Sequence, residues 1–191
     1  HLISRESESN PVLLQRSREI IAEVDKVAAQ LNEFINYSRP REVRRTSVSL
    51  KTVFVEITRA LAYDIEEKQI QVSAKDDNIT VLADEQLLRQ ALFNLLLNAI
   101  QAVGQGGRIG IIGRKSGSTE AAIEVVDDGP GVPPDKRSEI FKPYLTSQKS
   151  GTGLGLAVCQ QIVLAHGWEI ECLSNEPKGA VFRISRVELA A

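Results

Sequence analysis

The sequence predicts a two-layer α/β sandwich, in which helices cover one face of a mixed β-sheet and a long amphipathic helix precedes the domain. Two observations predict this fold class. Segments with helical periodicity and segments with strand periodicity alternate through residues 47–191. Most neighbouring strands are also separated by short turns, as in hairpins, which argues against a sheet of parallel strands alone. The 191 residues suffice for one well-filled domain and an appendage.

The first 40 residues predict the appendage. Residues 1–10 are polar and without period, which indicates a loop or a frayed end. Pro11 suits the first turn of a helix, and a heptad seam with steps of four and three follows it. The seam comprises Leu13, Ser17, Ile20, Val24, Val27, Leu31 and Phe34. Its apolar edge must pack against another helix, and the pattern ends at Pro40, before a basic linker at residues 41–46.

Residues 47–191 form the predicted sandwich. A short strand is expected at residues 46–50. An apolar stripe at every fourth residue predicts a helix over residues 51–68. Two strands are expected at residues 69–74 and 79–83, paired across the KDDN turn. Further strands are expected at residues 108–114, 121–126, 168–173 and 180–187, and a helix is expected in the run that begins near Gly155.

The longest helix of the sandwich is predicted at residues 84–103. Asp84 is a good N-cap, and no glycine or proline interrupts the nineteen residues after it. From Ala91 onward the helix is apolar on nearly every side, which is typical of a buried helix. Four amides nevertheless share one face, because their spacings are four, four and three: Gln90, Asn94, Asn98 and Gln101. An unpaired buried amide costs about 1–3 kcal/mol, so this stripe either caps loops and ordered water or lines a polar site.

Composition excludes some classes of function. The hydrophobic content of 42% is ordinary for a globular protein, and the net charge of −2 gives no reason to expect a nucleic acid or an anionic membrane as partner. Cys159 and Cys172 form no CxxC pair and are most simply reduced thiols of a cytoplasmic domain. The chain has no methionine and begins with His1, so we expect it to be a piece of a longer protein, whose attachment to a membrane stays open.

Two glycine-rich loops follow the longest helix. A β-branched strand enters a D-x-G-x-G turn at Asp127, Gly129 and Gly131. The second loop, GTGLGL at residues 151–156, has glycines at alternate positions and opens into a helical run. Glycine lets the backbone approach a ligand closely, and a helix N-terminus offers N–H groups to phosphate oxygens. Taken alone, the first loop is most often just a turn, and the second is a weak phosphate signal.

The amide helix, the D-x-G-x-G turn, the FKPYLT segment and the GTGLGL loop occur in one order. Together they resemble the N, G1, F and G2 boxes of the GHKL nucleotide-binding superfamily, whose domain is also called the Bergerat fold. Within it they are most similar to the catalytic and ATP-binding domain of bacterial sensor histidine kinases. The resemblance covers Ser47 to Leu189 and implies the same two-layer sandwich.

The resemblance implies a function. Such a domain holds MgATP and transfers the γ-phosphoryl group to a histidine on a dimerisation hairpin, for relay to a response regulator receiver domain. The full-length protein is then expected to be a homodimer. The heptad helix, which closes in Ser38-Arg39-Pro40, resembles the second helix of that hairpin. The helix that carries the acceptor histidine is not recognisable, so we expect the acceptor to be missing from these 191 residues.

The resemblance also assigns roles to residues. Asp127 would accept a hydrogen bond from the adenine amine, with Gly129 and Gly131 letting the chain turn beneath the base. Asn98 would offer its carbonyl to Mg²⁺, and Asn94 would orient Asn98 or a metal-bound water. Residues 142–150 resemble a short, mobile lid over the ATP. The remaining expected nucleotide contacts are Gln101, Tyr144, Thr146, Lys149, Gly151, Thr152, Gly153, Leu154, Gly155 and Leu156.

Several positions depart from the family pattern. ATPases of the superfamily, such as gyrase and MutL, carry a glutamate as general base where this chain has Asn94, and an amide cannot take a proton, so hydrolysis should be slow. Gln101 and Gln148 stand where lysines are common, which predicts modest affinity for ATP. Ala180 stands where serine or threonine is common near the adenine. His166, within an AHG sequence, suits the end of a helix better than the role of phosphoacceptor.

Two other functions compete with the kinase. An anti-sigma-type protein serine kinase would have the same fold, but it has no reason to carry the heptad helix. A nucleotide-gated interaction module would bind ATP without transferring phosphate, and the missing lysines permit this. Phosphoryl transfer to a histidine-bearing hairpin would separate the histidine kinase from the interaction module.

Overall fold

The computed structural model describes residues 15–17, 20–21, 42–145 and 153–190. The chain divides into two compact units, residues 1–39 and 40–191. In the first unit the described residues are helical, and Ile20, on the expected seam, is 64% exposed. Most of the predicted N-terminal helix lies outside the described residues, and its role in a dimerisation hairpin stays a prediction.

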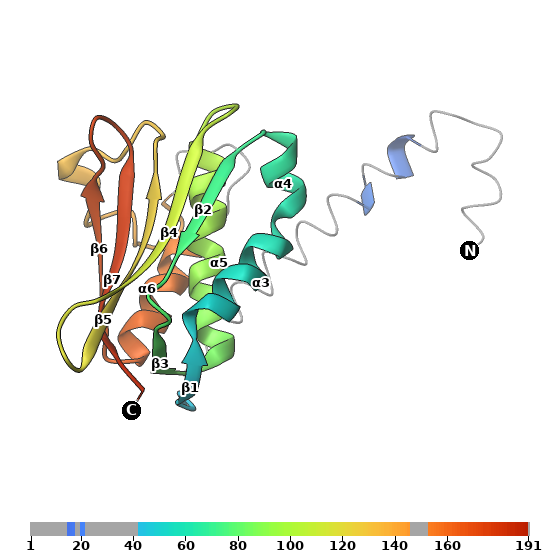
Figure 1. Ribbon diagram of the computed structural model, residues 1–191. Helices are drawn as coiled ribbons and strands as arrows, with labels where there is room; N and C mark the ends of the chain where they lie inside the picture. Colours follow the sequence, from blue (N-terminus) through green and yellow to red (C-terminus); the bar gives the residue numbers. More distant parts are fainter. Residues whose placement is uncertain (1–14, 18–19, 22–41, 146–152, 191) are drawn as a thin grey trace, which may run out of the picture. The chain divides into compact units, whose positions relative to one another are not determined.

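The second unit contains the sandwich, which Figure 1 shows with its helices on one side of the strands. In chain order the elements are β1 (Thr46–Ser49), α3 (Leu50–Ala60), α4 (Ala62–Glu67), β2 (Gln71–Lys75), β3 (Thr80–Ala83), α5 (Glu85–Ala102), β4 (Arg108–Lys115), β5 (Glu120–Asp127), the 3-10 turn η1 (Pro134–Lys136), α6 (Gly155–Ala165), β6 (Glu169–Ser174) and β7 (Ala180–Glu188).

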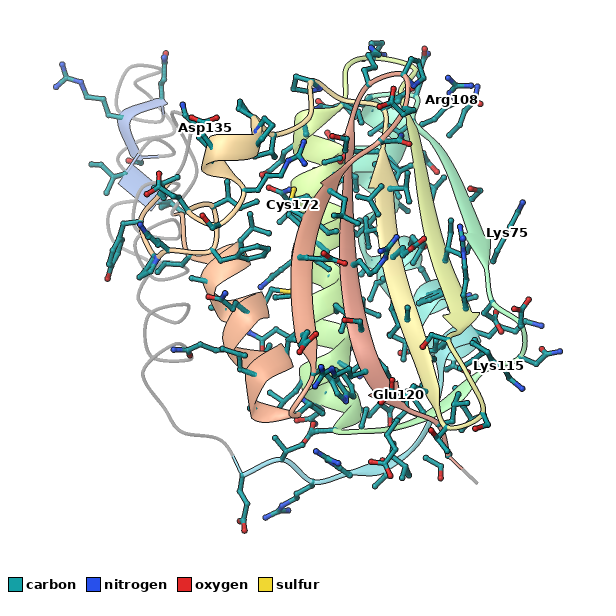
Figure 2. The ribbon with its side chains drawn as sticks, turned by 90° about the vertical axis from the view of Figure 1, so that its left-hand side faces the viewer. Lys75, Arg108, Lys115, Glu120, Asp135 and Cys172 are labelled. Atoms are coloured by element: carbon teal, nitrogen blue, oxygen red, sulfur yellow. The ribbon has the colours of Figure 1, made fainter. Side chains whose placement is uncertain are left out.

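The main sheet is mixed. Its order is β2-β4-β5-β7-β6, with β2 parallel to β4 and every other neighbouring pair antiparallel. Helices α3, α5 and α6 pack on one face of these strands, and Figure 2 looks onto the opposite face, with α5 behind the sheet. The predicted two-layer α/β sandwich with a mixed sheet is therefore confirmed.

The predicted hairpin between residues 69–74 and 79–83 is wrong. β2 pairs in parallel with β4, where Val72 lies opposite Ile109. β3 instead pairs with β1 in a separate two-stranded sheet, where Val81 lies opposite Val48. Both of these valines are buried, at 0% and 4% exposure. The KDDN turn is a local signal, whereas the choice of partner depends on which apolar strand faces can be buried together.

The helix expected over residues 51–68 is broken at Leu61. This residue leaves helical geometry (φ −106°, ψ 15°) and separates α3 from α4. Its side chain is buried, as are those of Ile57 and Val53 one and two turns earlier, whereas α4 has no buried residue. The break thus falls where the apolar stripe stops facing the core.

The core lies around α5. Its buried residues occur on several sides of the helix, because α3, α6 and β5 all pack against it. On the strands, alternate residues such as Ile111, Ile123 and Phe182 face this helix and are at most 1% exposed. The prediction of a buried central helix is confirmed, and Asp84 caps it by accepting the N–H of Leu87 at 3.1 Å.

The face of the sheet that turns away from the helices carries a charged row across four strands. Glu124 of β5 is only 6% exposed and accepts from Arg183 of β7 at 2.8 Å. Arg114 of β4 lies 3.4 Å from the other oxygen of Glu124, and Arg183 also reaches Glu171 of β6. These opposite charges alternate across the strands, so Glu124 is paired from both sides.

Candidate functional site

Asp127 ends β5 as a buried carboxylate, 2% exposed. Its Oδ1 accepts two backbone N–H groups, from Gly129 at 2.9 Å and from Ala180 at 3.3 Å. Burial raises the pKa of Asp127, while these two hydrogen bonds act in the opposite direction. Among the described residues no donor reaches Oδ2, so this oxygen is the one that can accept from a ligand amine.

The hairpin loop between β6 and β7 closes tightly on this turn. The side-chain amide of Asn175 donates to the Asp127 backbone carbonyl at 2.8 Å. Gly179 has φ +116°, and a Cβ there would overlap the same carbonyl oxygen. Gly131 has φ +75°, and a Cβ there would lie 2.7 Å from the Gly179 oxygen. Only glycine fits at these contacts, because both the backbone angle and the space exclude a side chain.

The amide stripe of α5 faces the start of α6 at one point. Asn94 donates its side-chain amide to the carbonyl of Gly155 at 3.1 Å. Asn98 lies one turn later, and Gln90 one turn earlier, and all three amides are half-buried. Gln101, at the end of the helix, is exposed. The structure thus brings Asn94 into contact with Gly155 of the GTGLGL sequence, whereas the role of Asn98 stays a prediction.

The N-terminus of α6 is suited to an anion. Leu154 is its N-cap residue and supplies no side-chain oxygen to the first N–H groups of the helix. These N–H groups can therefore donate hydrogen bonds to a ligand, and they carry a partial positive charge. Phosphate groups bind helix N-termini in this way.

Tyr144, near the start of the predicted lid, contacts the chain just before α6. Tyr144 donates its backbone N–H to the carbonyl of Gly153 at 3.0 Å, and the Tyr144 side chain is 64% exposed. The expected contacts Thr146, Lys149, Gly151 and Thr152 lie outside the described residues.

A metal in this site would depend on few protein atoms. Among the residues that the structure describes, no group of three or more His, Cys, Asp or Glu side chains could hold a metal ion. Mg²⁺ in nucleotide sites takes only one or two protein oxygens and the phosphates supply others, so the carbonyl of Asn98 fits that donor set.

His166 is part of the packing and not of the reacting chemistry. The side chain is 1% exposed and stacks on Trp168, with 4.3 Å between ring centroids. Its Nε2 accepts the backbone N–H of Asp84 at 3.0 Å, which leaves the proton on Nδ1, 2.7 Å from the carbonyl of Ile162. Burial lowers the pKa of His166, in keeping with a neutral ring. Both nitrogens are occupied, so neither can receive a phosphoryl group.

A pocket of about 530 Å³ lies beside the end of β5 and the β6–β7 loop. Arg108, Asp128 and residues 175–178 contribute to its lining. Asp127 also borders it, but neither Asn94 nor Asn98 does. This pocket therefore borders the D-x-G-x-G turn but does not include the amides of α5.

Comparison with known proteins identifies a family for this chain. The family described as histidine kinase-, DNA gyrase B- and HSP90-like ATPase matches residues 83–191. The sensor histidine kinase ZraS of Salmonella typhimurium is 37% identical over 164 residues, which cover 85% of this chain and 35% of that protein. The chain thus spans about a third of the length of this curated relative.

Solved structures of histidine kinases share the fold. Full-length ShkA in complex with AMPPNP superposes with a TM-score of 0.81 and 26% identity, over 93% of this chain and 40% of that one. Histidine kinase ThkA in complex with the response regulator TrrA superposes with a TM-score of 0.78 and 28% identity, over 95% and 53% of the two chains. No helix among the described residues is long and apolar enough to cross a membrane.

Proposed function

This chain belongs to the histidine kinase-, DNA gyrase B- and HSP90-like ATPase family, and from that premise we propose that it is the ATP-binding catalytic part of a sensor histidine kinase. It would transfer the γ-phosphoryl group of ATP to a histidine on a dimerisation hairpin, in a homodimeric parent protein. A response regulator receiver domain would accept the phosphoryl group next. ATP is a cytoplasmic nucleotide, so we place the domain in the cytoplasm.

The observation that carries this proposal is the buried carboxylate of Asp127. Two backbone N–H groups fix Oδ1, so Oδ2 has one direction in which to accept a hydrogen bond. The exocyclic amine of adenine is a donor of the right kind, and the turn of Gly129 and Gly131 leaves room for a flat base. The complex of ShkA with AMPPNP, a similar protein, supports this assignment.

The phosphate end would lie between α5 and α6. The uncapped N–H groups of α6 would bind phosphate oxygens, and Asn98 would offer one carbonyl to Mg²⁺. When bound, Mg²⁺ supplies positive charge to the phosphate oxygens. The residues of this chain then have one task, which is to hold the γ-phosphoryl group in line with an incoming nucleophile.

Asn94 favours transfer over hydrolysis. A general base for water must accept a proton, and an amide cannot do so. The amide of Asn94 is instead bonded to Gly155, where it holds the start of α6. The nucleophile that accepts the phosphoryl group must therefore come from outside this site, and a histidine on a separate helix is such a nucleophile. The complex of ThkA with TrrA supports the subsequent relay to a response regulator.

The test is phosphoryl transfer from labelled ATP. The 191-residue chain is incubated with MgATP and a complete dimerisation hairpin from its parent protein. We expect label on the hairpin and none on the chain itself, and the product should be acid-labile and base-stable, as a phosphoramidate is. Binding of ATP without any transfer would favour the nucleotide-gated module, and label on a serine of an added protein would favour a serine kinase.

A further inference from the structure

Helices α5 and α6 are joined at two separate places. In the middle of α5, Asn94 donates to the carbonyl of Gly155 in the first turn of α6. At the other end, the Nε2 atom of His166 accepts the backbone N–H of Asp84 at 3.0 Å. Asp84 immediately precedes α5 and His166 immediately follows α6. The two helices therefore run antiparallel and are bonded to each other at both ends of their contact.

Each helix connects these two bonds as a continuous rod. The two bonds are roughly 15 Å apart along each helix, at 1.5 Å per residue. On α5 this is the distance from residue 84 to residue 94, and on α6 it is the distance from residue 155 to residue 166. Helical hydrogen bonds resist stretching, so a shift of α6 along its axis at His166 appears at its N-terminus. The N–H groups proposed to bind phosphate would then move relative to Asn98.

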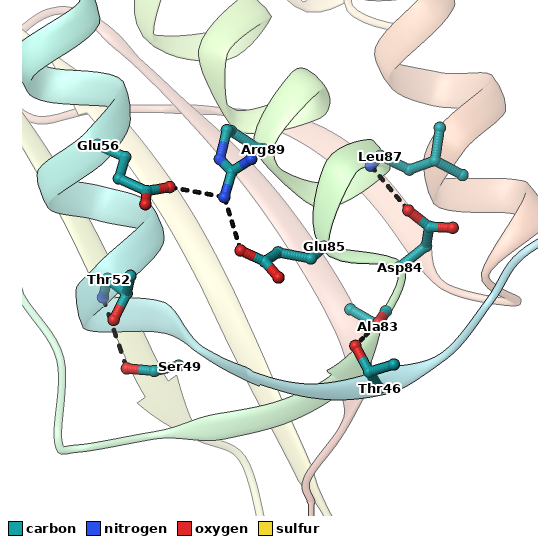
Figure 3. Close-up of polar contacts among 9 residues, drawn as sticks. All are labelled: Thr46, Ser49, Thr52, Glu56, Ala83, Asp84, Glu85, Leu87 and Arg89. Carbon is teal, nitrogen blue, oxygen red and sulfur yellow. Dashed lines mark hydrogen bonds and ion pairs between the residues drawn. The ribbon is translucent and has the colours of Figure 1, made fainter.

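The bond at Asp84 is part of a larger junction, of which Figure 3 shows the contact between the Asp84 carboxylate and the N–H of Leu87. One carboxylate oxygen of Asp84 caps α5 through the N–H of Leu87, and the other accepts the backbone N–H of Arg44 at 3.2 Å. The guanidinium group of Arg45 donates to the carbonyl of His166 at 2.5 Å and pairs with Glu188 at 3.1 Å. The segment that precedes β1 is thus bonded to the start of α5 and to the end of α6.

We propose that His166 is a positioning residue for the nucleotide site, which sets the axial register of α6 against α5 through its bond to Asp84. Arg45, in the segment that precedes β1, bonds to the carbonyl of His166 and so connects that segment to the end of α6. The inference rests on the proposed function, because the groups it positions are those of the proposed phosphate end. The adenine end, in contrast, is built on β5 and the β6–β7 loop and has no part in this junction.

Two substitutions of His166 distinguish the effect of its bond to Asp84 from the effects of its other contacts. In His166→Gln, the amide reaches about as far as Nε2 and can accept the N–H of Asp84. In His166→Asn, the amide lies near the position of Nδ1, where it can donate to Ile162 but cannot reach Asp84. The carbonyl of Ile162 keeps its backbone bond from residue 166 in either variant. The two variants are therefore a matched pair for the single bond to Asp84.

The experiment compares two ligands on three proteins. Dissociation constants for Mg–AMPPNP and for adenosine are measured on the wild type and both variants, at a temperature where all three are fully folded. We expect His166→Asn to bind Mg–AMPPNP about tenfold more weakly, the loss of roughly one hydrogen bond, and adenosine within about twofold of the wild type. His166→Gln should bind both ligands within about twofold of the wild type. Arg45→Ala should weaken Mg–AMPPNP binding by about threefold, again without effect on adenosine.

The outcomes are distinct. Wild-type affinity of His166→Asn for Mg–AMPPNP would overturn the positioning role. An equal loss of affinity for both ligands would also overturn it, because a general loosening of the fold affects the adenine end as well. Failure of the wild-type chain to bind Mg–AMPPNP would overturn the proposed function together with this inference, whereas the first two results leave the proposed function intact.

Discussion

The adenine end and the phosphate end of the proposed site are held by different kinds of contact. At the adenine end, the main chain does most of the holding. Two backbone N–H groups fix the carboxylate of Asp127, and Gly131 and Gly179 bring two loops into direct backbone contact. The two helices that form the phosphate end are bonded through side chains, namely Asn94 beside the N-terminus of α6 and His166 at its far end.

This difference has a physical consequence. Backbone contacts within and beside a sheet leave little freedom, because moving one of them disrupts the strand register. Helices α5 and α6 are bonded through side chains such as Asn94 and His166, and the apolar packing between them has no fixed direction, so a small axial shift costs less than a break in strand register. The adenine end is therefore expected to bind its base in one geometry, while the phosphate end can be adjusted from the segment that enters at Arg44 and Arg45. Substitutions at the two ends should accordingly have effects of different kind and size.

The largest effect is expected at Gly179. In Gly179→Ala the new Cβ would overlap the Asp127 carbonyl oxygen, at a φ that disfavours side chains. The strain of a positive φ alone is about 1–2 kcal/mol, and the overlap should bring the total loss in the free energy of unfolding to about 3 kcal/mol or more. Urea denaturation measures it. Gly104→Ala is the control, since a Cβ there meets nothing within 4 Å, and its stability should stay within about 0.5 kcal/mol of the wild type.

The second effect is expected at Asp127. Asp127→Asn keeps an oxygen for the N–H groups of Gly129 and Ala180 but places a donor where the adenine amine must donate. The loss of a hydrogen bond to a charged group predicts roughly 10- to 100-fold weaker binding of ATP, by calorimetry. Folding should not suffer. The folded-state pKa is raised, so stability is lost as the pH rises through that pKa, and a neutral amide removes this loss.

The adjacent carboxylate provides the control for that substitution. Asp128 accepts from Arg108 on the outer side of the turn, and Asp128→Asn should leave ATP affinity within about twofold of the wild type. Wild-type affinity in Asp127→Asn would remove the adenine assignment, and a marked drop in its thermal midpoint would show that the carboxylate stabilises the fold.

The sequence predicts those features of the two ends that depend on contacts between residues close together in the chain. The cap at Asp84, the amide face of α5 and the turn at Asp127 depend on neighbours within a few residues, and each could be read from spacing alone. Asn175 contacts Asp127 from 48 residues away, and no local pattern indicates it. Gly179, likewise, is one glycine in a hairpin loop until the turn at Asp127 is placed beside it. The loop at residues 175–179 contains a proline and a glycine, which predicts a turn but not the residues that the turn contacts.

The same limit explains the error at β2 and β3. Their sequences have strand periodicity, which was predicted, but the turn between them favoured a hairpin that the buried faces of β1 and β4 exclude. The prediction that His166 lies at the end of a helix is confirmed. Its bond to Asp84 spans 82 positions and could not be foreseen.

A third prediction concerns the metal at the phosphate end. Asn98→Ala removes the carbonyl proposed to bind Mg²⁺, so ATP affinity should fall by roughly tenfold in the presence of Mg²⁺, about 1.4 kcal/mol. In EDTA the variant and the wild type should bind ATP equally weakly. Gln86→Ala is the control, because Gln86 is exposed in the first turn of α5, twelve residues before Asn98, and it should keep the ATP affinity of the wild type. An equal loss with and without Mg²⁺ would assign Asn98 to the phosphates themselves.

The smallest effect is expected from protonation of His166. Burial and the nearby Arg45 lower its pKa in the folded state below the ordinary value of 6.5, whereas the bond to Ile162 and the carboxylate of Asp84 act the other way. Between the two pKa values the unfolded chain binds more protons than the folded chain. The neutral ring therefore contributes stability that is fully present above about pH 6.5 and is lost as the pH falls towards the folded-state pKa.

Thermal midpoints of the wild type and His166→Gln, measured from pH 7.5 to pH 5.5, isolate this contribution. Both proteins share every other titrating group, including the carboxylates, so the pH dependence of the difference between their thermal midpoints comes from residue 166. The advantage of the wild type should be largest at pH 7.5 and should shrink as the pH is lowered. Because protonated Nε2 cannot accept the N–H of Asp84, the affinity of the wild type for Mg–AMPPNP should fall over the same range, while its affinity for adenosine stays level. A constant difference in midpoint across this range would mean that the ring is held by its stacking on Trp168 and not by the acceptor bond.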